Sequence, residues 1–167
     1  MAELKIVIRD AVPADIFQIA PFFRAIISAG ETYTYPEGLD DQAIAELWLE
    51  RPPGHTIVAL NLDGLIVGSA KFGPNRPGRG SHIATASFMV DPAAQGQGVG
   101  RALGEAVLNL ARAQGFHGMQ FNAVVETNKA AVSLWQSLGF TIMTTIPEAF
   151  DHRRFGLVGL HVMYQKF

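Results

Sequence analysis

Short segments in which apolar residues alternate with polar ones, or run together, recur along the chain and predict β-strands. They cover residues 4–9, 55–60, 65–72, 82–90, 119–125, 140–146 and 158–165. Asn61-Leu62-Asp63-Gly64 lies between the second and third segments, and an Asp-Gly pair in this place favours a tight hairpin. Residues 31–39 and the glycine- and proline-rich residues 73–80 are expected to be loops.

Two segments in the first third of the chain repeat apolar residues at helical spacing. One begins at Pro13 and ends at Gly30, and Pro21 within it is expected to kink or split the helix. The other is capped by Asp40 or Asp41 and ends before the two prolines at 52 and 53.

Two further helices are predicted in the second half. One covers residues 101–114 and is stopped by Gly115, and the other is capped by Thr127 or Asn128 and closed by Gly139. The order of elements is therefore one strand, two helices, three strands, a helix, a strand, a helix and two strands. This order predicts an α/β fold in which helices flank a mixed sheet.

Composition narrows the class of protein. The chain has 167 residues, 49% of them hydrophobic and 17% charged, which suits one domain spanning residues 1–167. A net charge of −2 without a basic cluster argues against a nucleic-acid partner. Cysteine is absent, no signal sequence opens the chain, and no apolar run has the ~20 residues of a membrane span. We expect a cytoplasmic protein without a membrane partner.

The clearest candidate for chemistry is a glycine-rich segment. Gly96, Gly98 and Gly100 fall between a predicted strand and an amphipathic helix. Glycine allows close approach of a ligand to the backbone, and the amides of such a turn can bind a pyrophosphate together with the helix dipole. The alternative is a tight turn that binds nothing. A dinucleotide fingerprint is excluded because Arg101 stands where its third glycine belongs, and a Walker loop is excluded because no Lys-Ser or Lys-Thr follows.

Two motifs together resemble one known superfamily. Gln95-x-x-Gly98-x-Gly100 follows Phe88-Met89-Val90-Asp91-Pro92, and Asn128-x-x-Ala131-x-x-Leu134-Trp135-x-x-x-Gly139-Phe140 comes later. They are similar to the acetyl-CoA loop and the later helix of the GNAT superfamily of N-acetyltransferases. The resemblance implies a single GNAT-like α/β domain with a mixed, mostly antiparallel sheet of about seven strands.

The same resemblance assigns cofactor-binding positions. It implies acetyl-CoA as the co-substrate and no metal. The amides of Met89 and Val90 would bind the pantetheine and the thioester oxygen. The pyrophosphate would lie on the amides of Gly96, Gln97, Gly98, Val99, Gly100 and Arg101, with Gln95 beside it.

Residues of the later helix have two interpretations each. Asn128 would reach the pantetheine or the reacting end as a catalytic and cofactor-binding residue, but asparagine is also a favoured helix N-cap. Trp135 stands where many members of the superfamily have a tyrosine that protonates the leaving thiolate. An indole N–H cannot act as an acid near neutral pH, so we expect Trp135 to pack against the cofactor arm.

Two asparagines are candidates for the acceptor side. Asn122 lies within the apolar run 121–125, and a buried amide without a partner costs roughly 1–3 kcal/mol, so we expect either a structural hydrogen bond or a catalytic, substrate-binding role. Asn75 lies in a turn-rich loop. With Arg79, His82 and other scattered positions, both asparagines resemble the branch that contains the yeast L-azetidine-2-carboxylate N-acetyltransferase, which implies that Asn75 binds substrate.

The sequence does not identify a general base. Residues 82–90 contain no carboxylate, and their polar side chains are His82, Thr85 and Ser87, which could hold a water that takes the proton. We therefore expect an acetyl-CoA-dependent N-acetyltransferase for a small-molecule amine, as a homodimer. The acceptor is expected to be a proline-like imino acid or small amino acid. An acetyltransferase for another small amine, such as an antibiotic, and a non-catalytic CoA-binding module are the alternatives.

Overall fold

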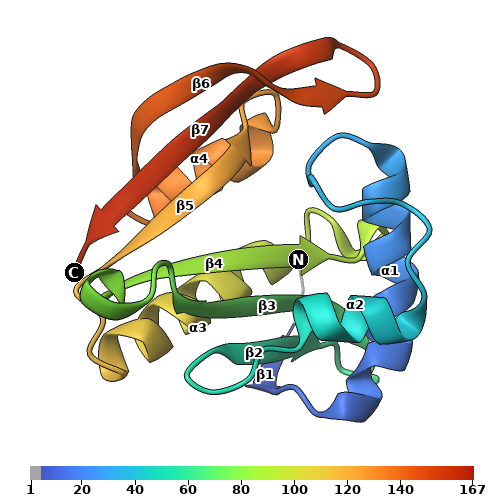
Figure 1. The fold of residues 1–167 in the computed structure, drawn as a ribbon. Helices are drawn as coiled ribbons and strands as arrows, with labels where there is room; N and C mark the ends of the chain where they lie inside the picture. Colours follow the sequence, from blue (N-terminus) through green and yellow to red (C-terminus); the bar gives the residue numbers. More distant parts are fainter. Residues whose placement is uncertain (1–4) are drawn as a thin grey trace.

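The computed structural model describes residues 5–167, which build a seven-stranded sheet in the order β1-β2-β3-β4-β5-β7-β6 (Figure 1). Every neighbouring pair is antiparallel except β4 and β5, which are parallel. The strands are β1 (Val7–Asp10), β2 (His55–Leu60), β3 (Ile66–Pro74), β4 (Ile83–Val90), β5 (Gly118–Val125), β6 (Thr141–His152) and β7 (Gly156–Lys166). The predicted mixed, mostly antiparallel sheet is confirmed.

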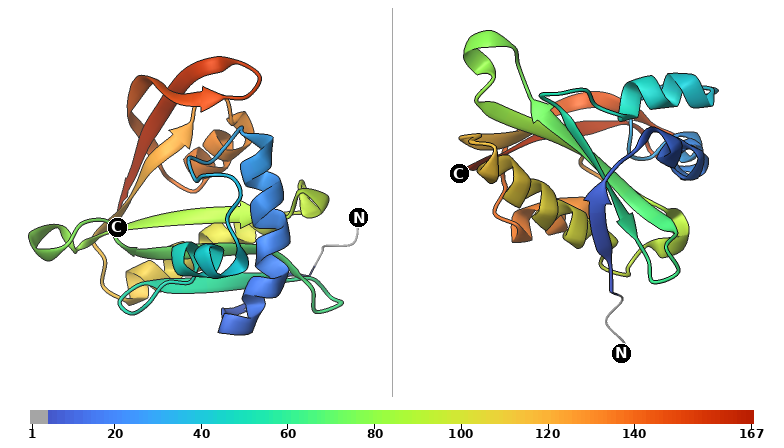
Figure 2. Two further views of the ribbon diagram at one scale, coloured as in Figure 1. Left: turned by 45° about the vertical axis from the view of Figure 1, so that its right-hand side comes forward. Right: turned by 90° about the horizontal axis from the view of Figure 1, so that it is seen from below.

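Four α-helices cover the sheet, two on each face (Figure 2, right). They are α1 (Ile16–Ala29), α2 (Asp41–Trp48), α3 (Val99–Ala113) and α4 (Lys129–Ser137), and three short 3-10 turns, η1 (Pro13–Asp15), η2 (Gly78–Gly80) and η3 (Pro92–Ala94), join elements. The α1/α2 face packs a core that includes Phe23, Trp48 and Met89. The opposite face packs a second core that includes Leu103 and Trp135. Strands β2 to β4 are therefore apolar on both faces.

Most predicted boundaries agree with the structure. Gly30 closes α1 with φ 66°, and the Asp40 side chain caps α2 by accepting from the Ala43 amide at 2.8 Å. The hairpin at residues 61–64 is confirmed by the Asn61 amide, which donates to the Leu65 carbonyl at 2.9 Å. These signals are local, so they act in the same way in any fold.

Four predictions need correction. Pro21 does not split α1, because its ring lies on the exposed side while the apolar face of the helix stays packed. The loop predicted from residue 73 begins later, since β3 continues to Pro74. β6 extends past Pro147 to His152 through a register shift between Ile146 and Phe150, which sequence alternation did not reveal. β1 begins at Val7, and position 4 of the predicted first strand lies outside the described residues.

The parallel pair β4–β5 is short, and the place where it ends determines where the cleft between the two strands lies. It comprises only Ile83 with Gly118 and Ala84 with Met119, after which the two strands diverge (Figure 1). On its other edge β4 stays paired with β3 as far as Val90. β5 stays paired with β7, with a register shift between Phe121 and Val124. The sheet therefore opens into a V. Its two walls are β4 and β5, and each is held on its outer edge by another strand, β3 and β7 respectively.

A buried carboxylate fixes β1 to the start of α1. Asp15 is 6% exposed and accepts two hydrogen bonds from the Arg9 guanidinium, at 2.7 and 2.9 Å, and one from the Val12 amide at 2.8 Å. The hydrogen bond from Arg9 is the main cause that lowers the pKa of Asp15 below its ordinary value, although burial opposes it. A lowered folded-state pKa means that this stabilisation is complete above the unfolded pKa and is lost as the pH falls through the folded one.

We predict that Asp15→Asn lowers the free energy of unfolding at pH 7 by roughly 1.5–3 kcal/mol, because a charged hydrogen-bond acceptor is removed from a buried site. The difference from wild type should shrink below about pH 4, where the Asp15 carboxylate of the unfolded wild-type chain takes up a proton before that of the folded protein. Urea unfolding at several pH values measures it. Asp63→Asn, in the exposed hairpin loop, is the matched control and should change little. A constant difference from pH 7 to pH 3 would contradict the prediction.

Candidate active site

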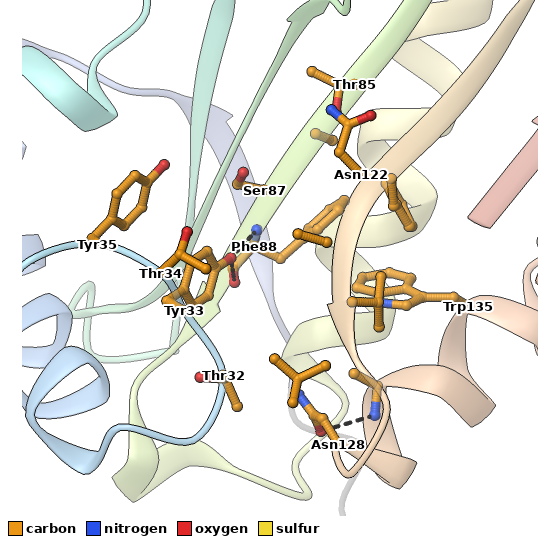
Figure 3. A pocket seen from close by; sticks show the side chains of 16 residues that line it. Thr32, Tyr33, Thr34, Tyr35, Thr85, Ser87, Phe88, Asn122, Asn128 and Trp135 are labelled. Atoms are coloured by element: carbon orange, nitrogen blue, oxygen red, sulfur yellow. Dashed lines mark hydrogen bonds between the residues drawn. The ribbon is translucent and has the colours of Figure 1, made fainter. Parts of the chain in front are cut away.

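The opening between β4 and β5 is a cleft of about 210 Å³ (Figure 3). Its walls come from residues 85–88 of β4, residues 121–125 of β5, residues 32–35 of the loop after α1, and Asn128, Ala131 and Trp135 at α4. None of these described lining residues is an acid, a histidine, a lysine or an arginine. Whatever binds in the cleft therefore meets hydroxyls, amides, aromatic rings and backbone.

The glycine-rich segment forms the turn into α3. Gly96 and Gly98 have φ values of 75° and 82°, in the left-handed region where glycine is favoured. The first intrahelical bond runs from the Ala102 amide to the Gly98 carbonyl, so the amides of Val99, Gly100 and Arg101 have no partner within the helix. A Cβ at Gly100 would lie 3.3 Å from Leu134 of α4, which explains a glycine there.

Side chains of this segment have different environments. Val99 is 1% exposed and belongs to the core, so it can offer a ligand only its amide. Gln95, Gln97 and Arg101 are exposed, and Arg101 donates to the Ser137 hydroxyl of α4 at 2.8 Å. The predicted pyrophosphate positions thus form a continuous stretch of amides at the start of a helix, a suitable anion site.

Successive backbone amides of β4 point alternately toward the cleft and toward β3. The Asp91 amide donates to Val67 of β3 at 2.9 Å, whereas the Phe88 amide donates in the opposite direction, to the Tyr33 hydroxyl, also at 2.9 Å. Because successive strand amides point to opposite edges, the Val90 amide faces the cleft and the Met89 amide faces β3. This corrects the predicted pair of amides: Met89 is 1% exposed, packs under α1 and α2, and cannot offer its amide to the cleft.

The two asparagines predicted for the acceptor side lie together. Asn122 Nδ2 donates to Asn75 Oδ1 at 2.7 Å, although 47 residues separate them. Gln120 Nε2 donates to Asn122 Oδ1 at 2.9 Å, and the Thr85 hydroxyl is 3.5 Å from Asn122 Nδ2. Asn122 is exposed, so the expectation of a buried amide was wrong, because the register shift in β5 turns this position out of the core. The network lies where β4 and β5 separate.

Asn128 and Trp135 line the other end of the cleft. Asn128 caps α4, its Oδ1 accepting from the Ala131 amide at 3.3 Å, which leaves its Nδ2 group for a ligand (Figure 3). Trp135 is 7% exposed and lies in an aromatic cluster, with ring centroids 4.6 Å from Phe88 and 5.0 Å from Phe121. Its surroundings suit packing against the aromatic cluster.

Several lining residues were not predicted as site residues. Thr32, Tyr33, Thr34 and Tyr35 form one wall, in a segment that the sequence indicated only as a loop. Alternation of threonine with tyrosine in residues 32–35 was a usable signal, since aromatic side chains are uncommon in a loop that only connects. Thr85 and Ser87, which the sequence already indicated as possible holders of a water, also line the cleft. Both residues also line a second hollow of about 330 Å³, whose lining includes Glu50 and Lys71.

Other candidates lie apart from the cleft. His82 is exposed at the start of β4 and packs edge-on against His117, with ring centroids 5.7 Å apart. Arg153 pairs with Glu37, and Arg154 with Glu31 at 3.4 Å. Among residues 5–167 there is no group of three or more metal-binding side chains, and no helix in that range is long and apolar enough to cross a membrane.

Comparison of the sequence with known proteins identifies its relatives. The profile of the Acetyltransferase (GNAT) family matches residues 20–140. The chain is 30% identical to the L-amino acid N-acyltransferase MnaT of Escherichia coli over 143 residues, which is 84% of this chain and 83% of that protein. It is 39% identical to the N-acetyltransferase aca1 of Schizosaccharomyces pombe over 84 residues, which is 50% of this chain and only 40% of that relative.

Solved structures share the fold. A GCN5-related N-acetyltransferase from Kribbella flavida has a TM-score of 0.94 and 53% identity, covering 97% of this chain and 98% of that one. The acetyltransferase yncA of Salmonella typhimurium, solved with its cofactor acetyl-CoA, has a TM-score of 0.85 and 26% identity, covering 97% and 94%. The chain therefore belongs to the GNAT family, as an N-acetyltransferase that uses acetyl-CoA as its co-substrate.

Proposed function

We propose that the enzyme acetylates the amine of a small amino-acid-like molecule and that a proline-like cyclic imino acid is its preferred acceptor. The observation that carries this proposal is the Asn75–Asn122 pair at the point where β4 and β5 separate. The relative MnaT, an L-amino acid N-acyltransferase, supports the amino-acid class. A homodimer and a cytoplasmic location stay predictions.

The cofactor is proposed to lie along the β4 side of the cleft. Amides of residues 96–101 at the start of α3 would hold the pyrophosphate, where the helix dipole also favours negative charge. The Val90 amide would donate to the pantetheine or thioester oxygen. Asn128 Nδ2 would donate to the same arm, and Trp135 would pack against it. When bound, acetyl-CoA would supply the activated acetyl group, and these residues would hold its pantetheine arm beside the edge of β4.

The acceptor is proposed to lie beside the asparagine pair. Since Asn75 Oδ1 already accepts from Asn122, the Asn75 Nδ2 group remains free to donate to a carboxylate. A neutral amide can hold that carboxylate without adding a second charge beside the reacting amine, which attacks only after it has lost its proton. Asn122 would orient the ring nitrogen, since it touches both Asn75 and the Thr85 hydroxyl.

The proton of the amine must leave without a charged side chain in the cleft. Thr85 and Ser87 line both hollows and offer hydroxyls that can hold a water at the acceptor. Tyr33 cannot serve as the base, because burial raises the pKa of its hydroxyl well above the ordinary value. We therefore propose transfer through water at the hydroxyls of β4.

We predict that Gly98→Val weakens acetyl-CoA binding about ten- to a hundredfold, since valine cannot keep φ near 82° and the amides turn away from the pyrophosphate. Isothermal titration measures the affinity. Gly115→Val is the matched control, because Gly115 has φ 85°, faces open space in the same way, and lies at the other end of α3. Equal losses of affinity in both variants would argue against this cofactor position.

The acceptor class is tested by measuring CoA thiol release with four amines. They are L-azetidine-2-carboxylate, a linear L-amino acid, an aminoglycoside and a lysine-containing peptide. We expect the cyclic imino acid to have the highest kcat/KM and the linear amino acid to follow. If the imino acid is the poorest of the four, the proposed acceptor is wrong, although the enzyme remains an acetyltransferase.

We predict separate roles for the two asparagines with that acceptor. Asn75→Ala should raise the acceptor KM about ten- to a hundredfold, because a hydrogen bond to a charged group is lost. Asn122→Ala should lower kcat more than it raises KM, because it orients the reacting nitrogen. Asn109→Ala, on the exposed side of α3, is the control. Wild-type kinetics in both cleft variants would exclude the proposed acceptor position.

A further inference from the structure

The inner edge of β4 lacks a neighbouring strand beyond Ala84. In a continuous sheet, the amide and carbonyl of Phe88 would bond to β5. The pairing of β5 with β4, however, ends at Met119. A backbone polar group that loses its partner away from water costs free energy comparable to a lost hydrogen bond. The opening of the V therefore needs something else to satisfy Phe88.

The Tyr33 hydroxyl satisfies both groups. It accepts from the Phe88 amide at 2.9 Å and donates to the Phe88 carbonyl, so one side-chain oxygen replaces the two bonds of a strand neighbour (Figure 3). The hydroxyl is buried, and this burial raises its pKa well above the ordinary value, so it stays protonated and keeps its donor. Tyr33 comes from the loop after α1, 55 residues before Phe88.

The ring of Tyr33 is fixed by its surroundings. It stacks on Tyr35, with centroids 5.6 Å apart and planes 11° apart, and meets the edge of Trp48 at 6.5 Å. The Trp48 indole N–H donates to the Ser69 hydroxyl at 2.8 Å, and that hydroxyl donates to the Ile57 carbonyl at 2.8 Å. The hydroxyl is thus connected to the paired part of the sheet through rigid, buried contacts.

We propose that Tyr33 is a positioning residue for acetyl transfer, whose hydroxyl takes the place of a strand beside Phe88 and so holds the Val90 amide toward the cleft. This inference rests on the cofactor position proposed above. The Phe88 carbonyl and the Val90 amide belong to adjacent peptide units joined at Met89. Because Met89 is buried and paired with Ser69 of β3, the angle between the two units is held, and fixing the first orients the second. Without the hydroxyl, Phe88 is free to bond water or β5, and the edge that receives the pantetheine changes shape.

Tyr33→Phe tests this directly, since it keeps the ring and removes only the hydroxyl. We expect the Kd for acetyl-CoA to rise about tenfold, as for the loss of one or two neutral hydrogen bonds at the edge that binds it. We also expect the Phe88 amide to exchange with solvent deuterium at least about tenfold faster, because Tyr33 is its acceptor. A role limited to ring packing would change neither value.

Tyr164→Phe is the matched control. Tyr164 lies in β7 and lines neither of the two hollows described above, so loss of its hydroxyl leaves the edge of β4 unchanged and this variant should bind acetyl-CoA like the wild type. Acetyl-CoA affinity that is unchanged or tighter in Tyr33→Phe would overturn the proposal, and tighter binding would show that the hydroxyl competes with the cofactor. If Gly98→Val loses affinity while Tyr33→Phe does not, the cofactor position stands and only the role of Tyr33 fails.

Discussion

The hydrogen-bonding requirement of the backbone is the constraint on which this structure depends. Two parallel strands that separate after two residue pairs leave a row of amides and carbonyls facing each other across a gap. Such groups must find partners, and this makes the gap both costly to form and suited to a ligand that carries its own amides. The pantetheine arm of acetyl-CoA is such a ligand. The Tyr33 hydroxyl meets the same requirement at Phe88 with a protein group.

Packing keeps the gap open. Met89 faces the core of α1 and α2, whereas Phe88 faces the aromatic cluster with Trp135 beneath α4, so both faces of β4 are anchored. β5 is tied to β7, and its register shift turns Asn122 out toward the cleft. The cluster also accounts for a tryptophan at position 135. Its ring fills the space between Phe88 and Phe121, where an acid would have been buried without a partner.

Electrostatics explain the neutral lining. Charged side chains outside the cleft lining pair with one another: Arg153 and Arg154 with Glu37 and Glu31, and Lys71 with Glu50 at 3.0 Å. The region that would surround the thioester and the acceptor amine carries amides and hydroxyls. With the cofactor placed as proposed, these groups would orient a reacting pair without favouring the protonated amine, and the negative pyrophosphate would lie on the amides at the start of α3.

The local features could be predicted from the sequence, because their causes lie within a few residues. Asp40, Gly30 and the Asp-Gly turn act through neighbouring backbone, and Gly98 adopts a positive φ where the glycine motif predicted a turn. The contacts between groups distant in the sequence could not be predicted, because they depend on how the whole chain folds. The tertiary structure brought Asn75 to Asn122, turned Asn122 to the surface, directed Val90 rather than Met89 to the cleft, and placed Tyr33 against Phe88. Such contacts depend on strand register and on the point where β4 leaves β5, and neither is encoded in any short segment.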